Sequence, residues 1–353
     1  MIDNWILRII LFPFTLLYRA IIAIRSSLYE VNLLKSVSFD VPVISVGNLN
    51  TGGSGKTPMI EYLIRQLDPF IRVSVLSRGY KRRTKGYLNV TVDATYSEVG
   101  DEPLLLKKKY PGVPIAVGEE RALAIPQLLQ NYDGIQLVLL DDAYQHRGVD
   151  PYINLLLTEY GNRYTRDFLL PMGRLREPRK AAERADMIVV TKCPADLTEE
   201  AMKTITNEIN PSPRQKIYFS TLRYHTAYNA FHTDERILLR DQAVFLMTGI
   251  ANPDSLVQFL MDRELVYFHR KFPDHYAFTK HDIATVIDSF EKMEEVKKVF
   301  LTTEKDLVRL VPHLHYFRSK GIDVYILPIE VQFLGRSDEF IQDIREKLLK
   351  FTV

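Results

Sequence analysis

Cysteine is almost absent from this 353-residue chain: Cys193 is the single one, so no disulfide can form within it. Such sparse use of cysteine fits a reducing compartment. The chain also lacks a strong net charge, +2 at pH 7, so its overall charge gives no reason to expect a nucleic-acid partner. We find no internal repeat and no low-complexity tract, which excludes repeat architectures. The length predicts about two domains.

A long uncharged hydrophobic run is missing as well. In the apolar N-terminal 36 residues the longest uncharged piece is Ile9 to Tyr18, ten residues, bounded by Arg8 and Arg19. A transmembrane helix needs about 20 apolar residues. No small-residue cleavage site follows, so a signal peptide is not predicted. We therefore predict that residues 1–36 form an amphipathic helix lying in a membrane interface. A helix packed on the protein's own core, or on a partner, remains the alternative.

The clearest motif runs from Val43 to Thr57, V-I-S-V-G-N-L-N-T-G-G-S-G-K-T. The apolar run at its start predicts a buried strand, and Lys56 opens a helix with Pro58 expected at its first position. A glycine-rich loop between a strand and a helix is typical of a phosphate-binding loop. A ligand-free turn is the alternative. The candidate nucleotide-binding residues are Asn50, Thr51, Gly52, Gly53, Ser54, Gly55, Lys56 and Thr57.

Each part of this loop has an expected task. Glycines 52, 53 and 55 allow positive φ angles, so that backbone N–H groups point inward. Lys56 would reach the β and γ phosphates of a nucleotide, and Thr57 would ligate Mg²⁺. The motif departs from its usual form at Asn50, where glycine is expected.

Carboxylates at strand ends provide the candidate metal site. The apolar run from Ile135 ends in Asp141 and Asp142, the pattern of a buried parallel strand that delivers a carboxylate to Mg²⁺. Asp101 and Glu102 follow Gly100 and suit a base or a metal ligand, although acids in this position also favour a helix N-terminus. The candidate Mg²⁺ ligands are Thr57, Glu102, Asp141 and Asp142.

Two basic loops, Ser77–Arg83 and Phe168–Lys180, are suited to an anionic ligand because arginine forms bidentate contacts with phosphate. A solvated basic turn is the alternative for the first. The candidate substrate-binding residues are Arg78, Tyr80, Gln145, His146, Arg174 and Arg176. The stretch T-K-C-P-A-D is close to the guanine-reading T-K-x-D, but Pro194 stands where the aspartate belongs, which argues against guanine.

About six short apolar runs alternate with helical patterns between Val43 and Val190, which predicts βαβ units and a largely parallel sheet. The composition breaks near Pro211, and a second α/β pattern starts at Val244. We expect an α/β fold: a P-loop NTPase-like core domain, a smaller α/β domain and an N-terminal membrane-associating helix. The expected divisions are 1–36 for that helix, 37–222 for the core, 223–335 for the smaller domain with linker strands, and 336–353 for a closing helix.

The motifs together resemble one family, the tetraacyldisaccharide 4′-kinases. The resemblance covers nearly the whole chain and rests on V-G-N-x-x-x-G-G-S-G-K-T-P, S-R-G-Y, G-D-E-P, D-D-x-x-Q-H, L-P-x-G-x-L-R-E-P, G-I-A-N-P, F-P-D-H-Y and T-E-K-D, in this order. The family usually has D-D-G-F-Q-H, and this chain has Ala143 and Tyr144 in place of Gly and Phe.

This resemblance implies an ATP-dependent kinase that phosphorylates the 4′-hydroxyl of a tetraacylated glucosamine disaccharide 1-phosphate in lipid A biosynthesis. It implies ATP and Mg²⁺ as cofactors, with Lys56, Asp101 and His275 as catalytic residues, the last two acting together on the hydroxyl. The partners would be the lipid substrate and the cytoplasmic face of a Gram-negative inner membrane, peripherally bound, with no obligate protein partner evident. A regulatory or metal-insertion P-loop GTPase is the alternative, and a non-catalytic nucleotide sensor is a third reading.

Overall fold

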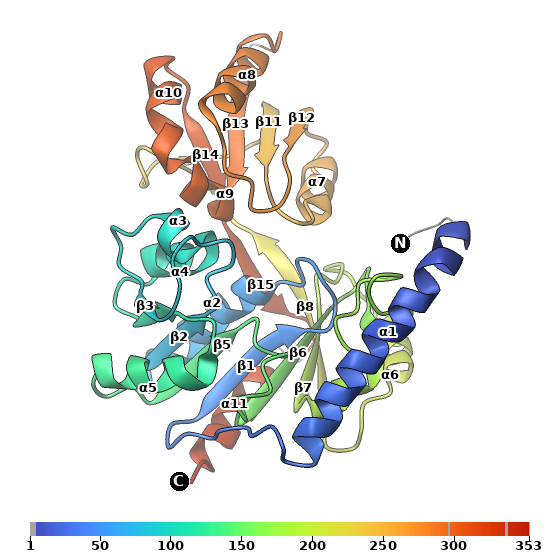
Figure 1. The fold of residues 1–353 in the computed structure, drawn as a ribbon. Coiled ribbons are helices and arrows are strands. Elements are labelled where there is room, and N and C mark those ends of the chain that lie inside the picture. The colour runs from blue at the N-terminus through green and yellow to red at the C-terminus, as the bar shows by residue number, and fades with distance from the viewer. Residues whose placement is uncertain (1–4, 296, 336–337, 353) are drawn as a thin grey trace.

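The computed structural model describes residues 5–295, 297–335 and 338–352, and the parts of the expected N-terminal and closing segments beyond these ranges lie outside the described residues. Among the described residues the strands form two sheets, of nine and six strands (Figure 1). The helices are α1 (Trp5–Glu30), α2 (Lys56–Leu67), α3 (Tyr96–Val99), α4 (Asp101–Lys109), α5 (Arg121–Asn131), α6 (Glu199–Ile209), α7 (Asp254–Met261), α8 (Lys280–Glu291), α9 (Glu304–Leu310), α10 (Leu314–Ser319) and α11 (Glu339–Leu349), with 3₁₀ turns η1 (Tyr164–Arg166), η2 (Arg179–Arg184) and η3 (Val311–His313). The strands are β1 (Val43–Asn48), β2 (Val73–Ser77), β3 (Leu88–Asn89), β4 (Ile115–Val117), β5 (Leu137–Asp141), β6 (Ile153–Glu159), β7 (Met187–Thr191), β8 (Lys216–Tyr224), β9 (Ala227–Asn229), β10 (Arg236–Ile237), β11 (Ala243–Thr248), β12 (Tyr267–Lys271), β13 (Lys298–Thr303), β14 (Val324–Leu327) and β15 (Ile329–Phe333).

The large sheet has the order β15-β8-β7-β6-β1-β5-β2-β4-β3 and is parallel from β8 to β4, with antiparallel strands β15 and β3 at its edges. Every residue of β1 and β5 is buried, as expected for central strands covered by helices on both faces. Val46 pairs with Asp141, so the phosphate loop and the aspartate pair leave the sheet side by side. This confirms the predicted α/β class and its parallel core.

The small sheet has the order β10-β9-β14-β13-β11-β12, with β11 to β14 parallel. Two antiparallel strands, β8 and β15, run from the large sheet toward it, and Tyr224 pairs with Ile329 where they leave (Figure 1). Helix α11 returns to the large sheet, where the Phe340 ring stacks on Phe333. We therefore propose the division into a core (37–222) and a smaller domain (223–335).

Several local expectations need correction. The break near Pro211 does not end the large sheet, because β8 follows it and pairs with β7. The basic loop Phe168–Lys180 runs into the 3₁₀ turn η2, and the sequence analysis did not predict α6. Pro58 is the third residue of α2, not the first; it still lies in the first turn, where backbone N–H groups have no partner within the helix.

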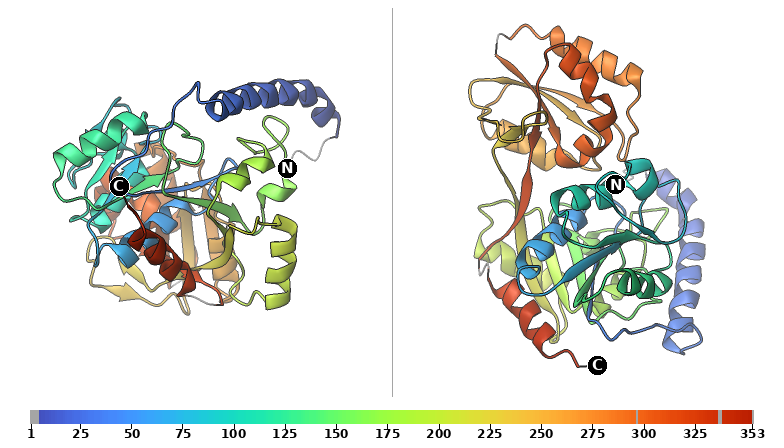
Figure 2. Two further views of the ribbon diagram at one scale, coloured as in Figure 1. Left: turned by 90° about the horizontal axis from the view of Figure 1, so that it is seen from below. Right: turned by 90° about the vertical axis from the view of Figure 1, so that its left-hand side faces the viewer.

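Helix α1 is one continuous 26-residue helix that passes through Pro13 and lies along the outside of the large domain (Figures 1 and 2). By length and composition, Ile9–Glu30 could cross a membrane, and only 6% of its most apolar window is buried. The limit inferred from the ten uncharged residues was therefore too strict. Few side chains tie it to the core: the Tyr18 hydroxyl donates to the backbone oxygen of Arg176 at 2.9 Å, and Arg25 donates to that of Gln145 at 3.1 Å.

Candidate active site

The phosphate-binding loop follows β1 and ends at α2, whose face carrying Met59, Ile60 and Leu63 is buried against the sheet. Gly52 and Gly55 have φ angles of +121° and +84°, as expected from a loop that turns its N–H groups inward. Gly53 does not have a positive φ angle, contrary to expectation. A Cβ on Gly53 would lie 3.3 Å from the Ala251 side chain of the smaller domain, so a larger residue there would require a small shift of Ala251.

Asn50 is accommodated because this position pairs with another loop. Its backbone forms an isolated antiparallel bridge with Leu175, and its side chain donates to Asp167 at 2.9 Å. Thr51 N–H also donates to the Arg174 carbonyl at 2.7 Å. The side chain that replaces the usual glycine therefore adds a bond to Asp167, the residue directly before the basic loop Phe168–Lys180.

Lys56 lies among polar partners at the mouth of the loop. Its ammonium donates to Asn48 at 3.2 Å and is 3.5 Å from Asp142, which also binds Arg176 at 3.1 Å. Burial acts to raise the pKa of Asp142, but the charges of Lys56 and Arg176 hold it below its ordinary value. Gln145 accepts a hydrogen bond from Arg176 and donates to the Asn48 carbonyl. The site thus holds two cations around one ionised carboxylate.

Asp141 is fully enclosed at the end of β5. Its Oδ2 accepts from Ser77 at 3.1 Å, while its buried Oδ1 has no hydrogen-bond partner. Burial, together with the charges of Glu102 and Asp142, raises the pKa of Asp141. Within residues 5–295, 297–335 and 338–352, no group of three or more His, Cys, Asp or Glu side chains is arranged to hold a metal ion. An orphaned carboxylate oxygen among like charges is nevertheless the environment that a divalent cation relieves.

Asp101 and His275 meet although 174 residues separate them in the chain. The Nδ1 atom of His275 lies 2.9 and 2.8 Å from the two Asp101 oxygens. Asp101 is also the first residue of α4. It therefore lies at a helix N-terminus and contacts His275 at the same time, so the two roles considered for it do not exclude each other. His275 has a left-handed φ of 55°, its N–H donates to the Gly249 carbonyl, and the Tyr80 ring lies 4.9 Å from the imidazole.

The smaller domain surrounds Asp101 with cations. Lys305 lies near His275 and binds Glu102 at 2.8 Å, while Arg309 Nε lies 3.6 Å from Asp101. Burial acts to raise the pKa of Asp101, but the hydrogen bond from His275 and the charges of Lys305 and Arg309 outweigh it and lower that pKa. Asp101 is therefore held as a carboxylate at neutral pH.

One cavity of ≈ 380 Å³ joins these groups. Its lining from the large domain includes the loop from Thr51 to Thr57, Tyr80, Glu102, Asp142 and Arg176, and its lining from the smaller domain includes Asn252, His275 and Lys305. Asp101 lies behind His275 and is 4% exposed. The phosphate loop and the Asp–His pair therefore face each other across one space between the domains.

The remaining candidate residues lie outside this lining. Asn50 and Arg174 line a neighbouring cavity of ≈ 250 Å³ beside the same loop. His146 lines a different one, with Tyr144 and Arg147. Burial, together with the charges of Arg121 and Arg78, lowers the pKa of His146 to about 4, so it is neutral at physiological pH and offers no charge to an anion.

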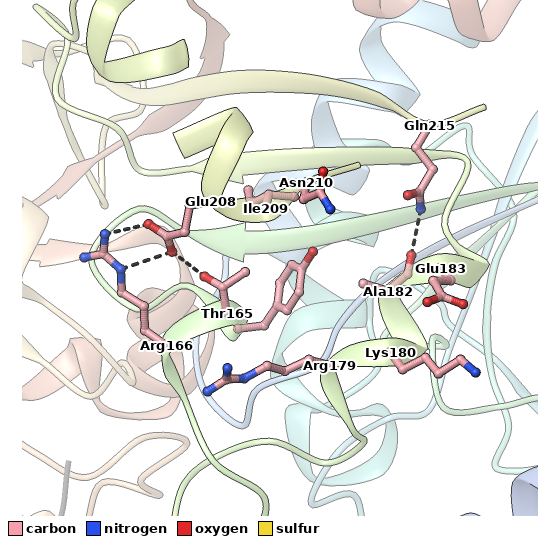
Figure 3. A pocket seen from close by; sticks show the side chains of 11 residues that line it. Thr165, Arg166, Arg179, Lys180, Ala182, Glu183, Glu208, Ile209, Asn210 and Gln215 are labelled. Atoms are coloured by element: carbon pink, nitrogen blue, oxygen red, sulfur yellow. Dashed lines mark hydrogen bonds and ion pairs between the residues drawn. The ribbon is translucent and has the colours of Figure 1, made fainter. Parts of the chain in front are cut away.

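A cavity of ≈ 470 Å³ on the large domain lies away from these residues (Figure 3). Its polar groups largely satisfy one another: Glu208 accepts from Thr165 and Arg166, and Gln215 donates to the Ala182 carbonyl. The phosphate-binding loop does not line it. The chemistry therefore belongs to the interdomain cavity.

Residues that the sequence analysis did not assign also belong to the site. Lys305 and Arg309 were not proposed, although T-E-K-D, which contains Lys305, was among the quoted motifs. Lys192, from the T-K-C-P-A-D stretch, lines the cavity and binds Glu159 at 3.1 Å. Lys192 directly follows the buried strand β7, whereas Lys305 and Arg309 lie on α9, which follows β13. A charged residue in such a position does not by itself indicate its partners.

The comparisons with known proteins agree with this geometry. A protein-family model described as tetraacyldisaccharide-1-P 4′-kinase matches residues 7–349. The chain belongs to the tetraacyldisaccharide 4′-kinase family. It is 39% identical to the tetraacyldisaccharide 4′-kinase of Phocaeicola vulgatus, over 96% of this chain and 93% of that one, and 40% identical to that of Flavobacterium johnsoniae, over 97% and 99%.

A solved structure supports the same assignment. LpxK from Aquifex aeolicus, in complex with ATP, superimposes with a TM-score of 0.74 and 30% identity, covering 97% of this chain and 99% of that one. Membership of the 4′-kinase family makes the chain a kinase, a phosphotransferase of lipid A biosynthesis. The GTPase alternative is correspondingly weaker.

Proposed function

We propose that this protein transfers the γ-phosphoryl group of ATP to the 4′-hydroxyl of a tetraacylated glucosamine disaccharide 1-phosphate. The observation that carries the proposal is the Asp101–His275 pair, which faces the phosphate-binding loop across one cavity. A nucleotide sensor has no use for a buried acid–base pair at that place. The names of the relatives, which are 4′-kinases, support the same acceptor.

In the proposed reaction the chain supplies position and charge, which dominate phosphoryl transfer. The N–H groups of the loop and the Lys56 ammonium bind the phosphates, and Lys56 leaves Asn48 and Asp142 to do so. His275 lies at the cavity surface, so it takes the hydroxyl proton, while Asp101 behind it orients the ring and balances its charge. Arg176 and Tyr80 line the same cavity and contact the acceptor.

Mg²⁺ fits the chemistry of the donors here. Asp141 has an unpaired buried oxygen, and Asp142, Glu102 and Thr57 line the ≈ 380 Å³ cavity between the domains. We propose that these four residues hold the ion, which would neutralise charge on the phosphates when bound. Hard oxygen ligands of this kind suit Mg²⁺ better than a softer metal.

We further propose that α1 holds the enzyme at the cytoplasmic face of the inner membrane. Its exposed Phe12, Phe14, Leu17 and Ile21 side chains are each about half or more accessible. An acylated substrate resides in the bilayer, so an enzyme that phosphorylates its headgroup has to work at that surface. The described part of α1 contacts the large domain beside Arg176, which places the membrane-facing helix next to the cavity.

One assay tests the activity directly. Labelled ATP and a tetraacyl disaccharide 1-phosphate in mixed micelles are incubated with the full chain and Mg²⁺, and the lipids are separated. A labelled bisphosphorylated lipid is the expected product, with ATP preferred to GTP. Nucleotide hydrolysis without lipid labelling, or preference for GTP, would contradict the proposal and favour the GTPase alternative.

A further inference from the structure

Lys305 lines the phosphate-binding cavity together with Lys56 and Lys192, and it approaches from the opposite domain to Lys56. It lies on α9, at the lower edge of the smaller domain next to α4 (Figure 1). Its Nζ atom is 2.8 Å from Glu102, 3.4 Å from Asp274 and 3.4 Å from Nε2 of His275. Three groups at the centre of the site therefore converge on one lysine.

The backbone that carries Lys305 is firmly held. Thr303 caps α9 by accepting from the Asp306 N–H, and fully buried Asp306 accepts from the Gly249 N–H at 3.0 Å and from Arg309 at 2.5 Å. The Gly249 carbonyl in turn accepts a hydrogen bond from the backbone N–H of His275. The backbone segments that carry Lys305 and His275 are thus joined by one buried network of the smaller domain.

The principal partner of Lys305 in this structure, Glu102, has a second proposed use. When Glu102 helps to hold Mg²⁺, its charge is shared with the ion, and Asp274, at 3.4 Å, is the carboxylate that stays beside the lysine. A buried ammonium that loses part of its countercharge is costly to keep, and the incoming phosphoryl oxygens can replace that part. The exchange leaves Lys305 facing the group that is being transferred.

We propose that Lys305 is a catalytic residue that contacts the transferring phosphoryl group and stabilises its charge in the transition state. The proposal rests on the kinase function proposed above. In that step the bond from the γ-phosphorus to the β–γ bridging oxygen breaks and a bond to the acceptor oxygen forms. The hydroxyl proton goes to His275, ADP leaves, and Lys305 neither gains nor loses a proton. A donor directed at charge that develops only in the transition state raises kcat more than ground-state binding.

Lys109 provides a matched control, because it is another largely buried lysine at the same domain interface, with one carboxylate partner in its own domain and one in the smaller domain. It binds Glu61 of the phosphate-loop helix at 2.5 Å and Glu304 of α9 at 3.0 Å, but it does not line the cavity. A purely structural interdomain lysine should behave like Lys109. A catalytic one should not.

The test compares Lys305→Met with Lys109→Met by titration calorimetry and steady-state kinetics. The ligands are ADP alone and ADP with aluminium fluoride, a mimic of the transferring phosphoryl group, both with Mg²⁺. We expect Lys305→Met to bind ADP within about threefold of the parent, to lose about 10²–10³ in affinity for the mimic, and to lose a similar factor in kcat. Lys109→Met should lower the melting temperature while the ratio of the two affinities is unchanged. Lys305→Arg should recover part of the loss.

Equal losses for ADP and the mimic in Lys305→Met would overturn the proposal, as would parallel behaviour of the two methionine variants. If Lys305→Met does not fold, a structure of the parent protein with ADP and aluminium fluoride decides: Lys305 against a fluoride supports the proposal, and Lys305 still on Glu102 refutes it. Failure of the proposed function is distinguishable, because the parent enzyme would then not label the lipid at all.

Discussion

Removing Asp101 and His275 singly and together tests whether they act as one unit. Both Asp101 oxygens lie within 2.9 Å of the same His275 nitrogen, so either substitution ends the same interaction. A general base contributes about 10²–10⁴ to the rate. If each alanine variant loses about 10³ in kcat, each loss is about 4 kcal/mol of barrier. Independent residues would then lose about 10⁶ in the double variant, whereas one unit should lose only about 10³–10⁴.

The assay is kcat for lipid phosphorylation in mixed micelles, with ATP affinity measured separately. Asp101→Asn accompanies Asp101→Ala, because asparagine keeps the shape of the side chain while removing its charge, and Lys305 and Arg309 keep Glu102 and Asp306 as carboxylate partners in both variants. Asp282→Ala is the matched control: Asp282 also lies in the first turn of a helix and completes its cap, but it is away from the cavity. It should lower stability and leave kcat near the parental value. Strictly multiplicative losses in the double variant would refute the dyad.

Three further predictions follow from other parts of the molecule. Lys56→Ala should fold normally and lose at least about 10²–10³ in kcat, because its charge acts mainly in the transition state, and near-normal turnover would remove the phosphate-loop assignment. Glutamate at the exposed Leu17 and Ile21 of α1, or deletion of residues 1–25, should move the protein from the vesicle pellet to the supernatant and raise KM for micellar lipid more than KM for ATP. Tyr18→Phe should still pellet, and unfolding of the truncated chain would favour a packed helix. Finally, burial, opposed by Lys109, raises the pKa of Glu61 to about 7, so the folded state holds this proton after the unfolded state has lost it, and the free energy of unfolding should fall by at most about 3 kcal/mol between pH 4.5 and 7. Urea titrations of Glu61→Gln across this pH range should not show that fall in the free energy of unfolding. A fall equal to that of the parent protein would contradict the assignment.

Local chemistry made the large domain predictable. Apolar β-branched runs such as Val43–Val46 form buried strands, and glycine-rich turns follow them, so strand, loop and helix could be placed from neighbouring residues alone. The parallel order then followed from alternating strands and helices. Smaller details failed where tertiary contacts decide: Gly53 lacks the expected positive φ and lies close to Ala251 of another domain, and α1 is longer than its uncharged stretch suggested.

The sequence by itself determined which residues are candidates for phosphate chemistry, because the loop from Asn50 to Thr57 and the carboxylates at the end of β5 each lie at the end of a single strand. The family resemblance implied that Asp101 and His275 act together, but only the tertiary structure decided their contact and brought Lys305 to Glu102. His275 lies 174 residues from Asp101, and Lys305 lies 203 residues from Glu102, and no spacing rule operates over such lengths. Their meeting depends on how the smaller domain packs against α4, because that packing buries Asp101 among cations and closes the cavity over the phosphate loop.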